Sequence, residues 1–280
     1  MKLIKKLNFD ICTFCNHKCT FCSNSDERTI KNQVTLNQYI QIMDNVIKYL
    51  DVKEIGLSAK GEVLINKDLS KIIKTTKDLY DIPYIYISTN GAKATKKELV
   101  SLLESGLDST KFSINATNRE DYLKIHLSDD FDKVIENLKI LIELKKASFV
   151  NHKIFISCVT DTNRDTLKKK FKNLLGKDNY QYINDIFVYK ITYTSKFDTI
   201  KSDKMIISKC KIPFDEIYIN SNCTLGLCCK DYFDEINFGS LLEDDFLTLY
   251  NSKEYKHIRQ MHITNDFPDN HLCKNCLLYN

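Results

Sequence analysis

Three cysteines near the beginning of the chain have the spacing of a metal centre. Cys15, Cys19 and Cys22 form a C-x3-C-x2-C pattern directly after an apolar, strand-like segment at residues 3–11. Thiolates this close together can hold one face of an iron–sulfur cluster, and three of them leave one iron of a [4Fe–4S] cluster without a protein ligand. A structural zinc site needs four ligands, and His17 is the candidate for the fourth. The spacing favours the iron–sulfur cluster, with zinc as the alternative.

A second group of cysteines lies in the last quarter of the chain. It consists of Cys210 in a C-x-x-P pattern, the adjacent Cys228 and Cys229, and a C-x-x-C pattern formed by Cys273 and Cys276. Separated thiolates that end in C-x-x-C can bind zinc as a ribbon or hold a second iron–sulfur cluster. The chain has 11 cysteines, and the apolar part of its first residues is too short for an export signal. Metal or redox chemistry in a reducing cytoplasm is therefore expected, rather than a disulfide framework.

The composition is that of an ordinary globular protein. Hydrophobic residues make up 43% of the 280 residues and charged residues 28%, so a large core can form. The net charge is only +4 and four residues are arginine, which argues against a groove that reads nucleic acid. No apolar run is long enough to span a bilayer. Neither a nucleic acid nor a membrane is expected as a partner.

Strand-like and helix-like segments alternate along most of the chain. The periodicity predicts strands at residues 3–11, 52–58, 84–89, 109–115, 153–160 and 183–193. It predicts helices at residues 36–50, 68–80, 96–104, 121–125, 131–146 and 166–175. Six strand–helix units predict an α/β fold with a parallel sheet closed or partly closed into a barrel, because an eight-fold barrel usually needs about 250 residues.

In parallel barrels, function gathers where the strands end. The cysteine loop follows the first strand, and small or hydrogen-bonding residues follow the next three strands at residues 58–62, 88–91 and 113–116. Taken singly, each segment is typical of an ordinary turn. Their shared position at consecutive strand ends indicates a binding site for a polar ligand beside the metal centre.

These motifs together resemble the radical S-adenosylmethionine (SAM) superfamily. The resemblance is carried by the C-x3-C-x2-C pattern with Phe21 before its last cysteine, by Lys60-Gly61-Glu62 and by Ser-Thr-Asn-Gly at residues 88–91. It implies a (βα)6 partial TIM barrel in which Cys15, Cys19 and Cys22 hold a [4Fe–4S] cluster whose open iron is chelated by S-adenosyl-L-methionine. It also implies reductive cleavage of SAM to a 5′-deoxyadenosyl radical, which abstracts a hydrogen atom from the substrate.

The resemblance assigns further residues to the SAM site. Lys60-Gly61-Glu62 matches the Gly-Gly-Glu motif that receives the methionine amino group, with Lys60 in place of the first glycine. Phe21 is expected near the adenine. Four polar residues stand where the family contacts ribose or carboxylate, or begins the substrate pocket: Ser88, Asn90, Ser113 and Asn115.

The tail resembles the SPASM/twitch extension of the same superfamily. The C-x-x-P pattern, a hairpin at residues 216–229, Gly-Ser-Leu at residues 239–241, a helix at residues 247–261 and the last C-x-x-C carry this likeness. It implies a barrel at residues 1–200 and an auxiliary domain at residues 201–280. The tail lacks the additional cysteines of a two-cluster SPASM domain, so the resemblance implies one auxiliary [4Fe–4S] cluster held by Cys210, Cys228, Cys273 and Cys276. Cys229 competes with Cys228 for the second position.

A fully ligated auxiliary cluster favours electron transfer, and hence the oxidation of a substrate radical. The preferred reaction is dehydrogenation of a small polar molecule such as a sugar or cyclitol, since the tail cysteines are spaced as in a twitch-type aminocyclitol dehydrogenase. A base must then take the hydroxyl proton, and the candidates are Tyr189, Lys190 and Tyr193. A reducing partner such as flavodoxin or ferredoxin would supply electrons.

Two other functions stay open. One is the modification of a peptide, either by epimerisation with Cys223 as the hydrogen-atom donor or by cross-linking. It is weakened because the first strand begins almost at residue 1, which leaves no room for an N-terminal peptide-recognition domain. The other is a zinc-binding interaction module on a barrel scaffold.

Overall fold

A single nine-stranded sheet organises the protein. The computed structural model describes residues 4–22, 31–57, 60–189, 210–269 and 271–277. The strand order is β6-β5-β4-β3-β2-β1-β7-β8-β9, and the first six strands in sequence run parallel. These six are β1 (Lys6–Phe9), β2 (Glu54–Gly56), β3 (Tyr84–Thr89), β4 (Ser109–Ser113), β5 (Lys153–Val159) and β6 (Asp185–Tyr189). The predicted partial barrel of six strand–helix units is confirmed.

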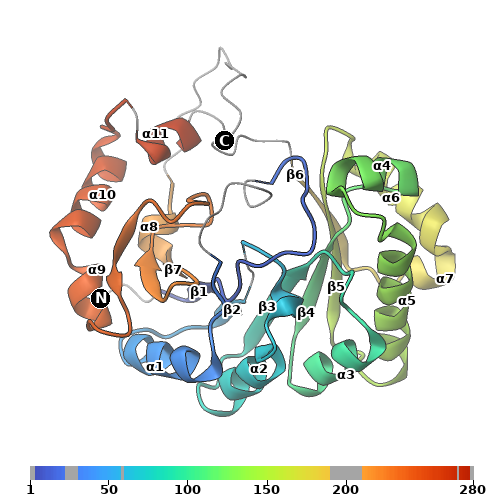
Figure 1. Cartoon of the computed structure of the whole chain (residues 1–280), viewed down its shortest axis with the longest axis horizontal. Coiled ribbons are helices and arrows are strands. Elements are labelled where there is room, and N and C mark those ends of the chain that lie inside the picture. Colours follow the sequence, from blue (N-terminus) through green and yellow to red (C-terminus); the bar gives the residue numbers. More distant parts are fainter. Residues whose placement is uncertain (1–3, 23–30, 58–59, 190–209, 270, 278–280) are drawn as a thin grey trace.

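Helices cover the outside of the curved sheet (Figure 1). They are α1 (Leu36–Ile47), α2 (Leu69–Asp78), α3 (Lys96–Glu104), α4 (Arg119–His126), α5 (Phe131–Ala147), α6 (Arg164–Leu175) and α7 (Lys177–Tyr180), with a 3-10 turn at Val63–Ile65. Hydroxyl and amide side chains fix where several of them begin. Thr35 forms a capping box with Gln38 at α1, and the Thr95 side chain accepts from the Glu98 N–H at α3.

The two faces of the sheet differ in chemistry. Along Tyr84–Thr89 every second residue is buried, with Ile85 and Ile87 in the hydrophobic core, and the residues between are half-buried on the other face. On that face the Tyr84 hydroxyl donates to Ser109 Oγ at 2.9 Å. The Tyr86 hydroxyl donates to Asn8 Oδ1 at 3.1 Å. The face turned away from the core helices, here called the inner face, therefore carries aromatic and hydrogen-bonding side chains.

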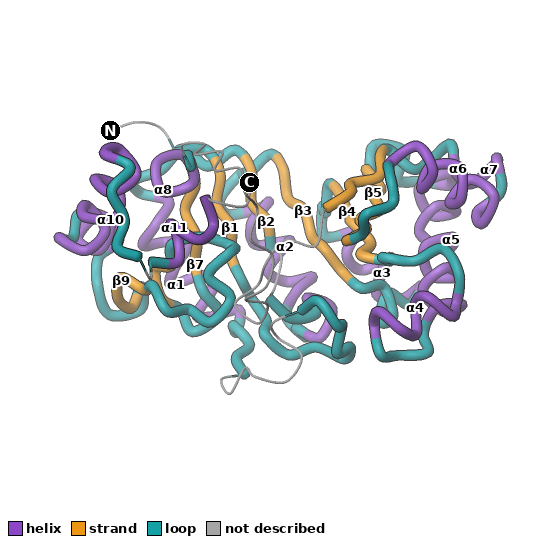
Figure 2. The backbone as a smooth tube through the Cα atoms, turned by 90° about the horizontal axis from the view of Figure 1, so that it is seen from above, coloured by secondary structure: helices purple, strands orange, loops and turns teal. Residues whose placement is uncertain are grey.

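The C-terminal unit continues the sheet of the barrel. It contains α8 (Ile212–Asp215), β7 (Glu216–Ile219), β8 (Thr224–Gly226), β9 (Asn237–Ser240), α9 (Phe246–Tyr250), α10 (Lys253–Thr264) and α11 (Leu272–Leu277). β7 pairs in parallel with β1 from Lys6↔Glu216 to Phe9↔Ile219, and Figure 2 shows these two strands side by side. The sequence did not indicate this pairing, because the two strands are about two hundred residues apart.

One predicted helix is divided in two. The segment at residues 247–261 forms α9 and α10, which are separated by Asn251 and Ser252. The Ser252 hydroxyl accepts from the Tyr255 N–H and so begins a new helix at this point. The prediction of one continuous helix was wrong because the apolar spacing runs across the break. None of the described helices has the length and apolar composition needed to cross a membrane.

His152 makes the stability of the barrel depend on pH. Its ring is buried, with Nδ1 2.9 Å from Leu107 O and Nε2 3.1 Å from Thr110 Oγ1. Burial lowers the pKa of His152 to about 4. Below about pH 6.5 the His152 ring therefore binds a proton in the unfolded chain but not in the folded chain. The free energy of unfolding falls as a result.

We expect His152→Gln to reduce this pH dependence. Between pH 6.5 and 5 the unmodified chain should lose about 2 kcal/mol more unfolding free energy than the variant, because the variant lacks the titrating group. Urea unfolding of both chains at several pH values measures the difference. Equal slopes in the two chains would contradict the role given to His152.

Candidate functional site

The cysteine loop lies on the end of α4. It follows β1, and the Lys18 N–H donates to His126 O at 3.3 Å. The Thr20 N–H donates to Ile125 O at 2.9 Å. These carbonyls belong to the last turn of the helix, where carbonyl groups lack partners within the helix. The backbone of the loop is thus bound to the end of α4 at Lys18 and Thr20.

The three thiols of this loop lie within range of one another's charge. The His17 N–H donates to Cys15 Sγ at 3.4 Å, and Asn90 Nδ2 donates to the same sulfur at 3.9 Å. The protein around Cys15 raises the pKa of its thiol to about 11 by desolvation, and the Cys22 thiol adds to the increase. Desolvation also raises the pKa of Cys19, with Cys22 and Cys15 adding to it. Such thiols ionise when a cationic centre offsets their charge, so this donor set fits an iron–sulfur cluster.

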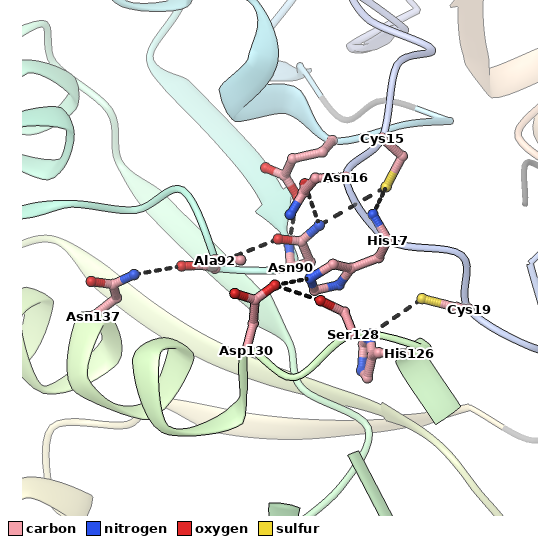
Figure 3. A network of polar contacts seen from close by, with 12 residues as sticks. Cys15, Asn16, His17, Cys19, Asn90, Ala92, His126, Ser128, Asp130 and Asn137 are labelled. Atoms are coloured by element: carbon pink, nitrogen blue, oxygen red, sulfur yellow. Dashed lines mark hydrogen bonds and ion pairs between the residues drawn. The ribbon is translucent and has the colours of Figure 1, made fainter. Parts of the chain in front are cut away.

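His126 contacts the middle cysteine, which the sequence did not indicate. Its Nδ1 lies 3.2 Å from Cys19 Sγ, and its Nε2 lies 2.8 Å from Ile114 O (Figure 3). The ring is buried and stacks on Tyr122 with centroids 4.1 Å apart. Burial lowers the pKa of His126 to about 4. Because 107 residues separate His126 from Cys19, no local spacing could have revealed the contact.

His17 is the residue that the zinc alternative needs. His17, Cys19 and His126 each place one ligand atom within 4.8 Å of the others. However, His17 Nε2 lies 3.0 Å from Asp130 Oδ2, and the Ser128 hydroxyl donates to the same oxygen (Figure 3). One ring nitrogen of His17 therefore anchors the loop to the segment before α5.

Lys60, Gly61 and Glu62 lie directly against the cysteine loop. The Lys60 N–H donates to Asp10 Oδ1 at 2.9 Å. The N–H groups of Gly61 and Glu62 donate to the carbonyls of residues 12 and 14, at 3.1 and 2.7 Å. All three N–H groups therefore have acceptors within the protein, and carbonyl oxygens remain to receive an ammonium donor. That inventory fits the methionine amino group of SAM. Residues 58 and 59 of this strand-end segment lie outside the described residues.

The Glu62 carboxylate is buried and links two segments by hydrogen bonds. Its Oε1 accepts from the Thr89 hydroxyl at 2.6 Å and from the Leu64 N–H at 3.0 Å. Its Oε2 accepts from the Asn90 N–H at 2.7 Å. Burial raises the pKa of Glu62, and these hydrogen bonds oppose the shift. The carboxylate thus joins the segment after β2 to the end of β3.

The polar residues at the ends of β3 and β4 differ in the hydrogen bonds that their side chains make within the protein. Asn90 Nδ2 donates to Asn16 Oδ1 at 3.1 Å, which turns Asn90 toward the cysteine loop (Figure 3). Asn115 is buried, and its Oδ1 accepts from the Val159 N–H at 2.8 Å. The Ser113 and Ser157 hydroxyls lie 3.0 Å apart on the inner face. Ser88 and Phe21 are half-buried.

The tail cysteines form a second group. Burial raises the pKa of Cys273, and the thiols of Cys228, Cys276 and Cys210 add to the increase in that order. The thiols of Cys228, Cys276 and Cys210 therefore each lie within range of the charge of Cys273, which is compatible with a shared cluster site. Cys229 is exposed to solvent, and its charged neighbours include Glu216 and Lys6 of the inner face. Of the two adjacent thiols, Cys228 is the one that raises the pKa of Cys273, so Cys228 is the ligand preferred in the proposal below.

The predicted hydrogen-atom donor and bases are placed very differently. Cys223 is only 3% exposed, lies in the turn after β7 at φ +66° and belongs to the hydrophobic core. Tyr189 is 46% exposed at the end of β6, and its hydroxyl accepts from Lys111 Nζ at 3.4 Å. Lys190 and Tyr193 lie outside the described residues.

Residues 10–173 match the Radical SAM superfamily, which is more than half of the chain. The chain belongs to the radical SAM superfamily. Residues 210–277 match the family described as an iron–sulfur cluster-binding domain, SPASM. The predicted family and its tail extension are therefore confirmed, and the cofactors of this radical SAM protein are SAM and [4Fe–4S] clusters. The zinc alternative for the first cysteine group was wrong.

Curated relatives of this radical SAM protein include two archaeal proteins named as probable GTP 3′,8-cyclases. The one from Methanocella arvoryzae is 26% identical over 176 residues, which are 62% of this chain and 54% of the relative. The one from Saccharolobus islandicus is 30% identical over 142 residues, which are 50% of this chain and 44% of the relative. The chain thus spans about half the length of the curated relatives it matches.

Several solved structures share the fold of this radical SAM protein. BtrN in complex with AdoMet and 2-DOIA has a TM-score of 0.60 at 17% identity and covers 93% of this chain and 87% of its own. Streptococcus suis SuiB bound to precursor peptide SuiA has a TM-score of 0.72 at 16% identity and covers 99% and 71%. The anSMEcpe structure with bound AdoMet and Cp18Cys peptide has a TM-score of 0.68 at 13% identity and covers 98% and 87%.

Proposed function

We propose that this radical SAM enzyme dehydrogenates a small polar molecule, such as a sugar or cyclitol, and that an auxiliary cluster accepts the electron released. The observation that carries the proposal is the iron–sulfur cluster-binding domain matched at residues 210–277, in which the thiols of Cys210, Cys228 and Cys276 lie within range of the charge of Cys273. Four thiolates leave no iron of an auxiliary [4Fe–4S] cluster open for substrate, and electron transfer is then its natural role. The match to BtrN, a complex with a small molecule, covers most of both chains and supports the same reading.

The reaction balances as follows. Cys15, Cys19 and Cys22 would hold the first cluster, and SAM bound there would supply a 5′-deoxyadenosyl radical, with methionine as the leaving group. The substrate carbon gives a hydrogen atom to this radical, the hydroxyl gives a proton to a base, and one electron leaves for the auxiliary cluster, so the alcohol becomes a ketone. In this proposal a flavodoxin or ferredoxin provides the initial electron.

The other proposed residues surround the cofactor. Residues 60–62 receive the methionine amino group through carbonyl oxygens, and Phe21 lies by the adenine. Ser88 and Ser113 serve the polar part of SAM or the substrate. Asn90 and Asn115 orient the strand ends, because their side chains already bond to protein groups.

The substrate class can be tested with a deuterium-labelled extract. Cells grown in deuterated medium provide a small-molecule fraction and a peptide fraction, and each is incubated with reconstituted enzyme, SAM and dithionite. We expect the small-molecule fraction to yield deuterium in 5′-deoxyadenosine, as detected by mass spectrometry. Deuterium transfer from the peptide fraction alone would contradict the proposal.

Tyr189 is the proposed base among the described residues. We expect Tyr189→Phe to lower product formation about 100-fold or more, the usual effect of removing a general base. Cleavage of SAM should continue, so the ratio of 5′-deoxyadenosine to product should rise. Tyr84→Phe is the matched control, since it removes a hydroxyl that bonds Ser109 lower on the same inner face. Equal losses in both variants would argue against a specific role for Tyr189.

Peptide modification is the second candidate, because two solved structures with a similar fold, SuiB and anSMEcpe, hold bound peptides. Cys223→Ala distinguishes the two candidates. It should spare a dehydrogenase and disable an epimerase that needs this thiol. The burial of Cys223 in the core favours the dehydrogenase.

A further inference from the structure

The Lys60 side chain leaves the proposed SAM-binding loop and enters the C-terminal unit. Its Nζ forms an ion pair with Asp234, donates to Asp231 O at 2.7 Å and lies 3.3 Å from Asn220 Oδ1. The ammonium also lies 5.1 Å from the centroid of the Tyr218 ring. The Lys60 side chain is 4% exposed and that of Asp234 13%. Because a buried charge needs partners, this contact holds only when the C-terminal unit is docked.

Two of the acceptors of Lys60, Asp231 O and Asp234, belong to the turn that follows Cys228 and Cys229. The Asp231 N–H donates to Cys228 O at 3.3 Å. The Asp231 carboxylate accepts from the N–H groups of Glu235 and Ile236 at 3.0 and 2.8 Å, which fixes the turn that carries Asp234. The position of the Lys60 partners therefore depends on the fold around Cys228.

The backbone of the same residue is bound to the first cysteine loop. The Lys60 N–H donates to Asp10 Oδ1, and the next N–H, of Gly61, donates to Cys12 O. Lys60 thus links two parts of the protein. Its main chain bonds to the first cysteine loop, and its side chain bonds to the turn that carries Asp234. The family motif has glycine at this position, which has no side chain to make such a link.

We propose that Lys60 is a positioning residue through which the auxiliary unit sets the conformation of the SAM-binding loop. The proposal rests on the role given above to residues 60–62 as the receiver of the methionine amino group. Loss of the ion pair frees the loop to move away from the carbonyl geometry that the amino group needs. SAM affinity then depends on the integrity of the C-terminal unit.

The test compares SAM binding by the reconstituted full chain with that of K60M, D234N and the double variant. Equilibrium dialysis gives the affinity, and the EPR spectrum of the reduced first cluster with and without SAM reports on coordination. We expect each single variant to weaken SAM binding about tenfold, within the range usual for coupling between sites. The double variant should bind SAM no more weakly than K60M does, because the two residues act through one contact. D234N leaves the loop sequence intact and so serves if K60M fails to fold.

Asn45 provides the matched control. Its Nδ2 donates to Leu241 O at 3.0 Å and Asp244 O at 2.7 Å, and its Oδ1 accepts from the Phe246 N–H at 3.0 Å. N45A therefore breaks contacts between the same two units at α1, away from the SAM-binding loop. It should lower the melting temperature and leave SAM affinity unchanged. Unchanged SAM affinity in both K60M and D234N, or an equal loss in N45A, would overturn the proposal. Substrate is absent from this measurement, so a wrong substrate class would not affect its outcome.

Discussion

A chain in which Cys15, Cys19 and Cys22 are all alanine is expected to bind about four irons after anaerobic reconstitution, against about eight for the unmodified chain. The loss follows because these thiols lie within range of one another's charge and hold the proposed SAM-binding cluster. The remaining irons belong to the tail cysteines, which this variant leaves intact. Formation of 5′-deoxyadenosine should fall to the background level, since no iron remains to coordinate SAM. Iron and sulfide analysis together with chromatography of the nucleoside products measures both effects.

Cys158→Ala is the control for this triple variant. Cys158 is fully buried in β5, and burial raises the pKa of its thiol to about 12, as for an apolar core residue. Its replacement should leave the iron content at about eight. If instead the unmodified chain binds about four irons and the triple variant binds none, the tail holds no iron–sulfur cluster. That result would leave the radical chemistry standing and remove the proposed electron acceptor.

Gly61→Ala is expected to abolish tight SAM binding. A β-carbon at this position would lie 2.2 Å from the carbonyl oxygen of Phe14 and 2.6 Å from the carbonyl carbon of Thr13. Both are backbone atoms, so either the cysteine loop or the segment after β2 must move. Such overpacking usually costs about 1–3 kcal/mol of stability, and here the strain falls on the segment that receives the methionine amino group. SAM binding and iron content are measured on the same preparation. A loss of iron shows that the cysteine loop has moved, and a loss of SAM binding alone shows that the segment after β2 has moved.

Gly176→Ala separates this steric effect from the general cost of replacing a glycine. Gly176 has φ +78°, and a β-carbon there would meet no atom within 4 Å. The control variant therefore carries backbone strain of about 1 kcal/mol without crowding. It should bind SAM as the unmodified chain does. Wild-type SAM affinity in Gly61→Ala would show that the close approach of the two segments plays no part in binding.

The sequence predicted elements well where local signals agree. β3 and α3 begin and end at the predicted residues, because β3 alternates strictly and the Thr95 side chain caps α3. The strand predicted at residues 3–11 is shorter, since β1 ends at Phe9 and the chain then turns into the cysteine loop. The C-x3-C-x2-C pattern indicated the family only together with residues 60–62 and 88–91.

Contacts between distant segments could not be predicted in this way. His126 beside Cys19 and Asp234 beside Lys60 join residues that are 107 and 174 positions apart. Nothing in the neighbourhood of either residue distinguishes it from an ordinary helix-end histidine or loop aspartate. The pairing of β7 with β1 could not be predicted for the same reason, because strand pairing depends on the whole topology and not on the strand alone.

That pairing imposes an order on the synthesis of the protein. β1 leaves the ribosome well before its second neighbour, because Asn8 of β1 bonds Glu216 of β7 across 208 positions. At about 5–20 residues per second, the interval is about 10 to 40 seconds. During that time one edge of β1 is open to pairing with other nascent chains. The strand that leads into the first cysteine loop therefore gains its second neighbour only after β7 has been translated.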